Sequence, residues 1–324
     1  METNSFRTEI QKQETEYCIS HKNPVMLIGS CFAENIGEKL LEYKFITDVN
    51  PFGILFNPAS IVQGLNILTD TFLFREDDLH FYNNEWISFF HHGKFSHSDK
   101  QTCLDAINTR LIYSRDFLTK ADFLILTLGT TTIYKYKGDI VANCHKFPQK
   151  EFQQSTLDFK DIVSNLVNSI EKIKAINQNI RIIFTVSPVR YIKNNMIENT
   201  LSKSQLIVAV HELMKVVKNS YYFPAFEIMM DDLRDYRFYN NDMIHPSQVA
   251  IDYIWKIFSE TFFDKSTIEI NGAIKDILLA ANHRIKNHSS EASHKFKEMQ
   301  VEKIKQIQTL YPHILFTKEL SYFK

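Results

Sequence analysis

Residues 24–35 read PVMLIGSCFAEN, and the rest of the chain is organised around this stretch. The four apolar residues after the proline form a run too short for a helix, which predicts a buried strand. Gly29 ends the run, and Ser30 stands where apolar residues begin to recur at helical spacing. Backbone N–H groups at a helix start are unpaired and favour a developing negative charge. The junction therefore predicts either a helix-capping serine or a serine nucleophile.

The composition is that of a globular protein without a strong charge bias. Of 324 residues, 44% are hydrophobic and 23% are charged, and the formal net charge is −1. This balance gives no general attraction to nucleic acid or to an anionic membrane, so neither is expected as a partner. Residues 1–17 lack the apolar core of a signal peptide, and no run approaches the ~18–20 apolar residues of a membrane span. We therefore expect a cytoplasmic location.

Neither the cysteines nor the histidines form a metal-binding motif. No CxxC pair occurs among the four cysteines, which are Cys18, Cys31, Cys103 and Cys144. A zinc ribbon or a dense disulfide framework is therefore not indicated. The three histidines within residues 91–97 do not have the i, i+4 spacing of a helical metal pair. We expect no metal and no organic cofactor.

Strand and helix patterns alternate along the chain. Apolar runs predict further strands at residues 45–49, 121–128, 180–186 and 221–228, with helical periodicity between them. This order predicts an α/β fold: a three-layer α/β/α sandwich around a mostly parallel five-stranded sheet. An aromatic insertion at about 77–99 is expected to hold a β-hairpin with its turn at Asn83-Asn84. We expect a domain over residues 1–264 and a carboxyl-terminal helical extension over 265–324.

A second chemical motif, Asp242-x-x-His245, precedes the predicted helix at 248–263. On a loop at a helix entrance the carboxylate can accept the imidazole N–H, which fixes the tautomer and leaves the other ring nitrogen basic. The alternative is a loop histidine with an incidental acidic neighbour. Paired with Ser30, the motif predicts a Ser-His-Asp triad.

Several further motifs lie between the two segments described so far. The full set is Gly29-Ser30-Cys31-Phe32-Ala33, Asn50-Pro51-Phe52-Gly53, Leu126-Thr127-Leu128-Gly129-Thr130, Cys144-His145-Lys146, Thr185-Val186-Ser187-Pro188-Val189-Arg190, Ser202-Lys203, Leu233-Arg234-Asp235-Tyr236-Arg237-Phe238-Tyr239 and Asp242-Met243-Ile244-His245-Pro246-Ser247. In these motifs, over roughly residues 20 to 260, the chain resembles the GSCFA family, which is related to the SGNH (GDSL-like) hydrolases. The resemblance implies an SGNH/flavodoxin-like fold, with Ser30 as nucleophile, His245 as base and Asp242 as the group that orients it.

The resemblance also implies an oxyanion hole. Its donors would be the backbone N–H groups of Ser30 and Gly53, together with the third block of the family at Gly129 and Thr131. SGNH enzymes have an asparagine in that block, and this chain has none there. A hydroxyl of Thr130 or Thr131, or the side chain of His145 or Arg190, is therefore expected to act as donor. Asn50, Thr130, His145, Arg190 and Cys31 are the candidate pocket residues, and Cys31 is expected to pack beneath the turn.

The resemblance implies hydrolysis of a small O-acyl ester, such as an acetyl ester, with a small molecule or a glycan as substrate. Two alternatives stay open: acyl transfer by the same triad, and an inactive protein that only binds a ligand. Trp86, Phe89 and Phe90 are candidates for stacking on a sugar, or are core residues. The sequence does not determine the oligomeric state.

Overall fold

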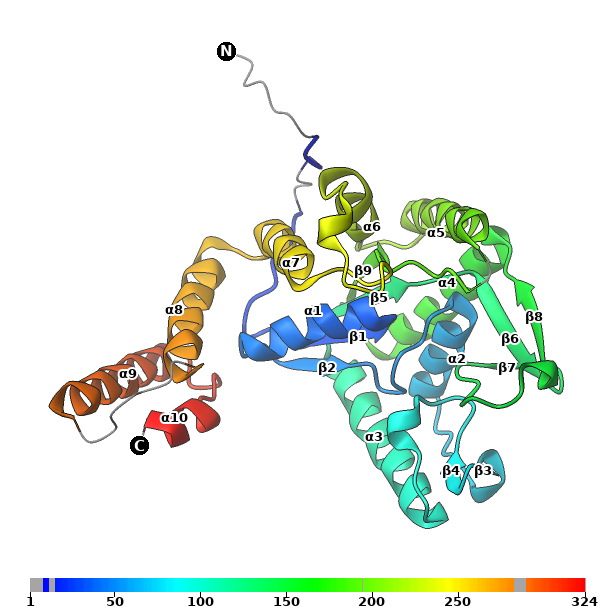
Figure 1. The fold of residues 1–324 in the computed structure, drawn as a ribbon, viewed down its shortest axis with the longest axis horizontal. Helices are drawn as coiled ribbons and strands as arrows, with labels where there is room; N and C mark the ends of the chain where they lie inside the picture. Colours follow the sequence, from blue (N-terminus) through cyan, green and yellow to red (C-terminus); the bar gives the residue numbers. More distant parts are fainter. Residues whose placement is uncertain (1–7, 12–14, 194, 283–289, 324) are drawn as a thin grey trace.

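The central element is a five-stranded parallel sheet (Figure 1). We describe it from a computed structural model that covers residues 8–11, 15–193, 195–282 and 290–323. The strand order is β10-β9-β5-β1-β2, so the chain winds outward in both directions from β1. The strands are β1 (Val25–Gly29), β2 (Thr47–Val49), β5 (Phe123–Leu128), β9 (Arg181–Val186) and β10 (Ser220–Phe223). The predicted sheet is confirmed.

Helices cover both faces of this sheet, as predicted. The side chains of β1, β5 and β9 alternate between two apolar clusters, which is why the strands read as continuous hydrophobic runs. One face packs against α2 (Pro58–Thr69), α3 (Lys100–Lys120), α4 (Phe159–Ile176) and α5 (Met196–Val216). The other face packs against α1 (Cys31–Glu42) and α7 (Gln248–Phe262).

The junction between β1 and α1 depends on Gly29. Its φ of +149° is a conformation that side-chain-bearing residues rarely adopt, and an added Cβ would lie 2.2 Å from Thr127 O. The two strands therefore stay paired to the end of β1, where Ser30 N–H donates to Thr127 O at 3.2 Å. The Ser30 hydroxyl accepts from Phe32 N–H at 3.3 Å and caps α1, which begins at Cys31.

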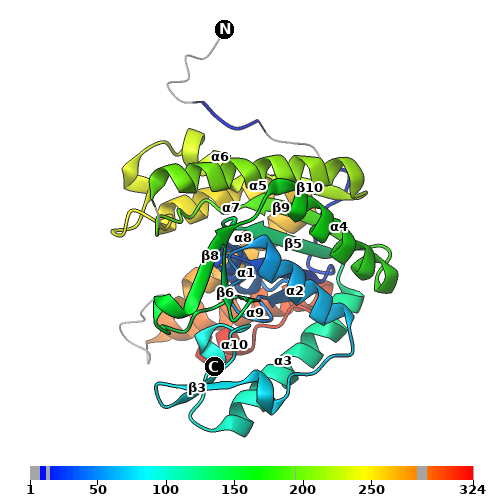
Figure 2. The same ribbon diagram turned by 90° about the vertical axis from the view of Figure 1, so that its right-hand side faces the viewer.

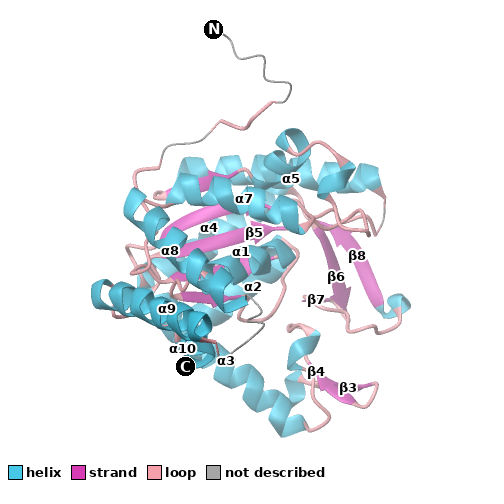
Figure 3. Ribbon diagram, turned by 60° about the vertical axis from the view of Figure 1, so that its left-hand side comes forward, coloured by secondary structure: helices cyan, strands magenta, loops and turns pink. Residues whose placement is uncertain are grey.

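Outside the central sheet, the predicted hairpin is present and a second small sheet was missed. Strands β3 (His80–Tyr82) and β4 (Glu85–Ile87) pair antiparallel across Asn83 and Asn84, both at positive φ. The missed sheet consists of β6 (Thr132–Tyr136), β7 (Asp139–Val141) and β8 (Phe152–Thr156). Figure 3 shows both features apart from the central strands. The last predicted strand was too long, because Pro224 lacks an N–H and the chain turns into α6 (Ala225–Glu227).

The carboxyl-terminal residues form helices α8 (Lys265–Asn282), α9 (Glu291–Leu310) and α10 (Thr317–Phe323). They share their own apolar cluster and lie on the opposite side of the molecule from the β6–β8 sheet (Figures 1 and 2). An ion pair of 2.6 Å between Lys44 and Glu319 joins them to the end of α1. In the described part of the chain, no helix combines the length and apolar character that a membrane crossing requires.

Replacing Gly29 by alanine should lower the free energy of unfolding by at least ~3 kcal/mol, because it adds backbone strain and a steric overlap with Thr127 O. Urea denaturation followed by circular dichroism measures the change. The matched control is Gly272→Ala in α8, where an added Cβ meets nothing within 4 Å. That change should stabilise by about 0.5–1 kcal/mol. Equal unfolding midpoints for the two variants would contradict the role given to Gly29.

Candidate active site

A cavity of about 350 Å³ lies at the carboxyl ends of β1, β5 and β9. In doubly wound sheets, this edge is where ligands bind. Five segments of the chain form its wall, in sequence order Ser30, Cys31, Phe56, Gly129, Thr130, Ser187, Val189, Arg190, Tyr191, Ile192, Lys193, Ile244 and His245. The cavity therefore brings the two predicted catalytic segments, more than two hundred residues apart, to one place.

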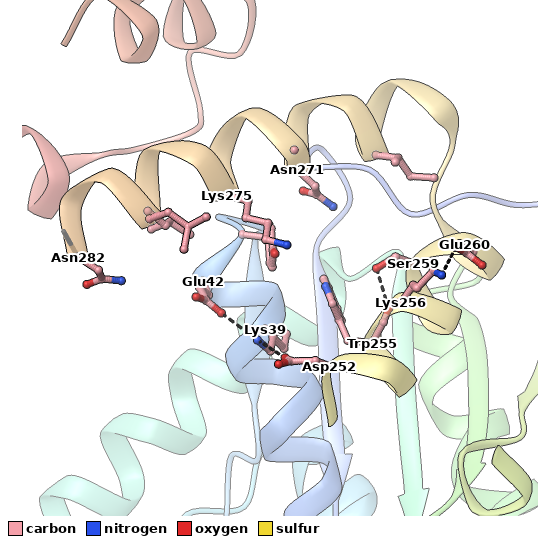
Figure 4. A pocket seen from close by; sticks show the side chains of 15 residues that line it. Lys39, Glu42, Asp252, Trp255, Lys256, Ser259, Glu260, Asn271, Lys275 and Asn282 are labelled. Atoms are coloured by element: carbon pink, nitrogen blue, oxygen red, sulfur yellow. Dashed lines mark hydrogen bonds and ion pairs between the residues drawn. The ribbon is translucent and has the colours of Figure 1, made fainter. Parts of the chain in front are cut away.

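A larger cavity of about 600 Å³ lies between α1, α7 and α8 (Figure 4). Two of its lysines are paired with carboxylates: Lys39 Nζ lies 2.8 Å from Asp252, and Lys256 Nζ lies 3.8 Å from Glu260. The Ser259 hydroxyl is also engaged, since it donates to the Trp255 carbonyl within the same helix. This cavity marks the joint between α7 and the carboxyl-terminal helices and offers no group prepared for chemistry.

Asp242 and His245 form a close hydrogen-bonded pair at the smaller cavity. His245 Nδ1 lies 2.6 Å from Asp242 Oδ2, and both side chains are a little under half exposed. Asp242 Oδ1 accepts the backbone N–H groups of Ile244 and His245 at 2.8 and 3.0 Å. The His245 N–H, then the imidazole and then the Ile244 N–H lower the pKa of Asp242 to about 2. A carboxylate at this distance favours the imidazole tautomer that carries its proton on Nδ1, in which Nε2 has the lone pair.

The side chain that meets His245 Nε2 is Cys31, not Ser30. Cys31 Sγ lies 3.7 Å from Nε2. The expectation that Cys31 packs beneath the turn is therefore wrong. Ser30 is only 1% exposed, and its hydroxyl accepts the Phe32 N–H as a helix cap. Burial raises the pKa of the Cys31 thiol.

Each backbone N–H that the family resemblance assigns to the oxyanion hole already donates within the protein. The Ser30 N–H donates to Thr127 O at 3.2 Å, and the Gly53 N–H to Asn50 O at 2.8 Å. The Gly129 N–H donates to Phe56 O, and the Thr131 N–H donates to the Ser202 hydroxyl. By contrast, Cys31 N–H donates to no other residue that the structure describes, as expected for the first residue of a helix.

The remaining pocket candidates divide into two groups. Thr130 and Arg190 line the cavity; the Thr130 hydroxyl lies 3.2 Å from the Ser202 hydroxyl, and the Arg190 guanidinium lies 4.1 Å from the Tyr239 ring centre. Asn50 and His145 do not line it.

Asn50 and His145 have structural partners instead. Asn50 is fully buried, and its side-chain oxygen accepts the Gly29 N–H at 2.9 Å, which helps to fix the backbone between β1 and α1. Its Nδ2 donates to no residue that the structure describes. His145 Nε2 lies 2.7 Å from Ser88 O, in the region of the hairpin. The Cys-His neighbour pair at 144–145 therefore does not contribute to this cavity.

The aromatic residues proposed for sugar stacking pack into the protein. Phe89 is 8% exposed within an apolar cluster, and Phe90 packs edge-on against Phe52. Trp86 lies beneath the Lys100 ammonium at 4.7 Å. None of the three lines the cavity of Ser30 and His245, so the core interpretation fits better than a role in binding at this site.

Lys203 is the residue whose importance the sequence did not reveal. It is 1% exposed, and its ammonium nitrogen lies 2.6 Å from Gly129 O and 2.7 Å from Ser187 O. Both carbonyls belong to cavity-lining residues, so Lys203 joins the ends of β5 and β9. Burial lowers its pKa to about 7. Its only sequence signal was its place in the Ser202-Lys203 motif.

Fold and site together define a doubly wound α/β protein in which a thiol at a strand-to-helix junction contacts a histidine–aspartate pair. The chain belongs to the GSCFA family, whose sequence profile matches residues 24–258. A second profile, the C-terminal domain of GSCFA domain proteins, matches residues 274–324.

Other comparisons return distant likenesses. Among curated proteins, no sequence matches this chain. A family 3 carbohydrate esterase from Clostridium thermocellum is 11% identical with a TM-score of 0.36, covering 78% of this chain and 98% of its own. A carbohydrate esterase of family 3 from Talaromyces cellulolyticus is 12% identical with a TM-score of 0.35, covering 78% and 99%.

The depressed pKa of Lys203 predicts a pH-dependent stability. Between pH about 7 and 10.5 the unfolded lysine is protonated while the folded one is largely neutral, so the unfolded state binds more protons. The free energy of unfolding should therefore rise with pH across this window. A neutral amine keeps two hydrogens, enough for both carbonyls. Urea denaturation at pH 7 and 9.5 measures the rise, which Lys203→Met should remove; parallel pH curves would contradict the assignment.

Proposed function

We propose that this cavity is the active site of an esterase-type hydrolase that removes a small O-acyl group. The observation that carries the proposal is the Asp242–His245 pair, whose free ring nitrogen faces the start of α1. A base held in one tautomer beside a nucleophilic side chain at a helix N-terminus is the arrangement that acyl transfer requires.

The chemistry follows from the positions of these groups. His245 Nε2 takes a proton from a side chain of the Ser30-Cys31 junction, and that side chain attacks the ester carbonyl. The same imidazole returns the proton to the departing alcohol, and water then releases the acyl group by the reverse steps. Asp242 stabilises the imidazolium in both halves of the reaction.

The cavity suits a small acyl group of low polarity. Its volume of about 350 Å³ is near the lower end for ligand pockets, and Phe56, Val189, Ile192 and Ile244 give it an apolar wall. No acidic side chain is among the described residues that line it, whereas Arg190 and Lys193 are. An acetyl or similarly short ester, including one on a carbohydrate hydroxyl, fits the volume and the apolar wall.

Removing the base should abolish most ester hydrolysis. His245→Asn and Asp242→Asn should each lower kcat/KM for p-nitrophenyl acetate by ~10²–10⁴-fold, because the proton transfer or the tautomer is lost. The control is His211→Asn on the exposed face of α5, which should leave the rate unchanged. If His245→Asn and wild type hydrolyse at equal rates, the cavity is not the site of hydrolysis. Added alcohols that divert the acyl group would identify acyl transfer.

A further inference from the structure

We infer that the nucleophile of this site is the Cys31 thiol, and that Ser30 is the cap that positions it. The inference rests on the proposed function and deepens it, because it changes the chemical class of the acyl-enzyme from an ester to a thioester. Three features of the β1–α1 junction support it.

The first feature is the direction of the two side chains. Cys31 Sγ is 3.7 Å from His245 Nε2, within the contact distance of a thiol and an imidazole, and Asp242 completes the relay. The Ser30 hydroxyl instead accepts the Phe32 N–H, and the residue is 1% exposed. No contact between the Ser30 hydroxyl and His245 is found among the described residues, so the imidazole is placed to take its proton from Cys31.

The second feature is the supply of N–H donors. The attacking atom and the oxyanion donors must be neighbours, since the oxyanion forms on the carbon under attack. The Ser30 N–H is bound to Thr127 O, while the Cys31 N–H donates to no other described residue, only to its own thiol sulfur, and lies at the positive end of the α1 dipole. A nucleophile at Cys31 therefore has its own N–H available for the oxyanion.

The third feature is the protonation state of the thiol. Buried Lys203, held by Gly129 O and Ser187 O, has a pKa lowered to about 7, so above that pH it adds little charge to stabilise a resting Cys31 thiolate. Burial raises the pKa of the thiol, so the resting group is the protonated thiol. His245 therefore acts as a true base during attack, rather than sharing a preformed ion pair.

The covalent steps balance without any further reagent. The S–H proton moves to His245 Nε2 as the S–C bond to the acyl carbon forms and the carbonyl electron pair moves to oxygen. The carbonyl re-forms, the C–O bond to the alcohol breaks, and the alkoxide takes the proton from His245. Water then attacks the thioester, giving its proton to His245, and the C–S bond breaks to regenerate the thiol and release the carboxylic acid.

The first test compares variants of the two junction residues in p-nitrophenyl acetate hydrolysis. Cys31→Ala should lose ~10²-fold or more in kcat, as for removal of a nucleophile. Cys31→Ser should keep part of the rate, because a nucleophilic atom stays beside His245. Ser30→Ala should cost about 1 kcal/mol of stability through the lost cap, yet stay within tenfold of the wild-type rate. The reverse pattern, with Ser30→Ala inactive and Cys31→Ala active, would overturn the inference while leaving the proposed hydrolase intact.

The second test does not require turnover. Cys31 and Cys144 are both partly buried thiols, and only Cys31 contacts an imidazole ring nitrogen. Peptide mapping after iodoacetamide treatment should show Cys31 alkylated ~10-fold faster than Cys144, because His245 can take the Cys31 proton as the sulfur attacks, and His245→Asn should remove that advantage. A rate equal to that of Cys144, unaffected by His245→Asn, would overturn the inference. If Cys31 reacts as expected but no ester is hydrolysed, the thiol nucleophile stands and the proposed ester substrate fails.

Discussion

The close contact between Gly29 and Thr127 O determines where the candidate site forms. Because no side chain fits at residue 29, β1 and β5 remain paired up to the turn, and α1 has to begin at Cys31. The first residue of a helix at the carboxyl edge of a parallel sheet has an unpaired N–H and a side chain near neighbouring strand ends. The loop before α7 brings His245 to that same edge, so one backbone constraint positions both halves of the site.

Much of the fold could be predicted from the sequence, because the strands of the central sheet are continuous apolar runs. The hairpin could also be predicted, since Asn83 and Asn84 tolerate the positive φ that its turn requires. The β6–β8 sheet could not be predicted, because its strands are short and polar residues interrupt their apolar pattern. In β8 (Phe152–Thr156), every residue after Phe152 is polar. The pairing of Asp242 with His245 depends only on local spacing, which explains why it was visible without a structure.

The sequence alone could not determine whether Ser30 or Cys31 contacts His245, and the reason is geometric. Neighbouring residues at a helix start point about 100° apart, so the side chain that meets the imidazole depends on the residue at which the helix begins. That position is set by contacts of Gly29 with residues far along the chain. The state of most of the predicted oxyanion donors was equally hidden, since the N–H groups of Ser30, Gly129 and Thr131 are bound to acceptors that only the fold brings near.

The absent third-block asparagine and the position of Cys31 make chemical sense together. A serine hydroxyl is a weak nucleophile at neutral pH and depends on several well-placed donors to stabilise the oxyanion. A thiol is intrinsically more nucleophilic, so acyl transfer to a thiol depends less on hydrogen bonds to the oxyanion. The N–H donors assigned by resemblance are bound to other residues, while the Cys31 N–H donates to no other residue that the structure describes. A thiol next to His245, with its own N–H facing the developing charge, is therefore the nucleophile that these surroundings support best.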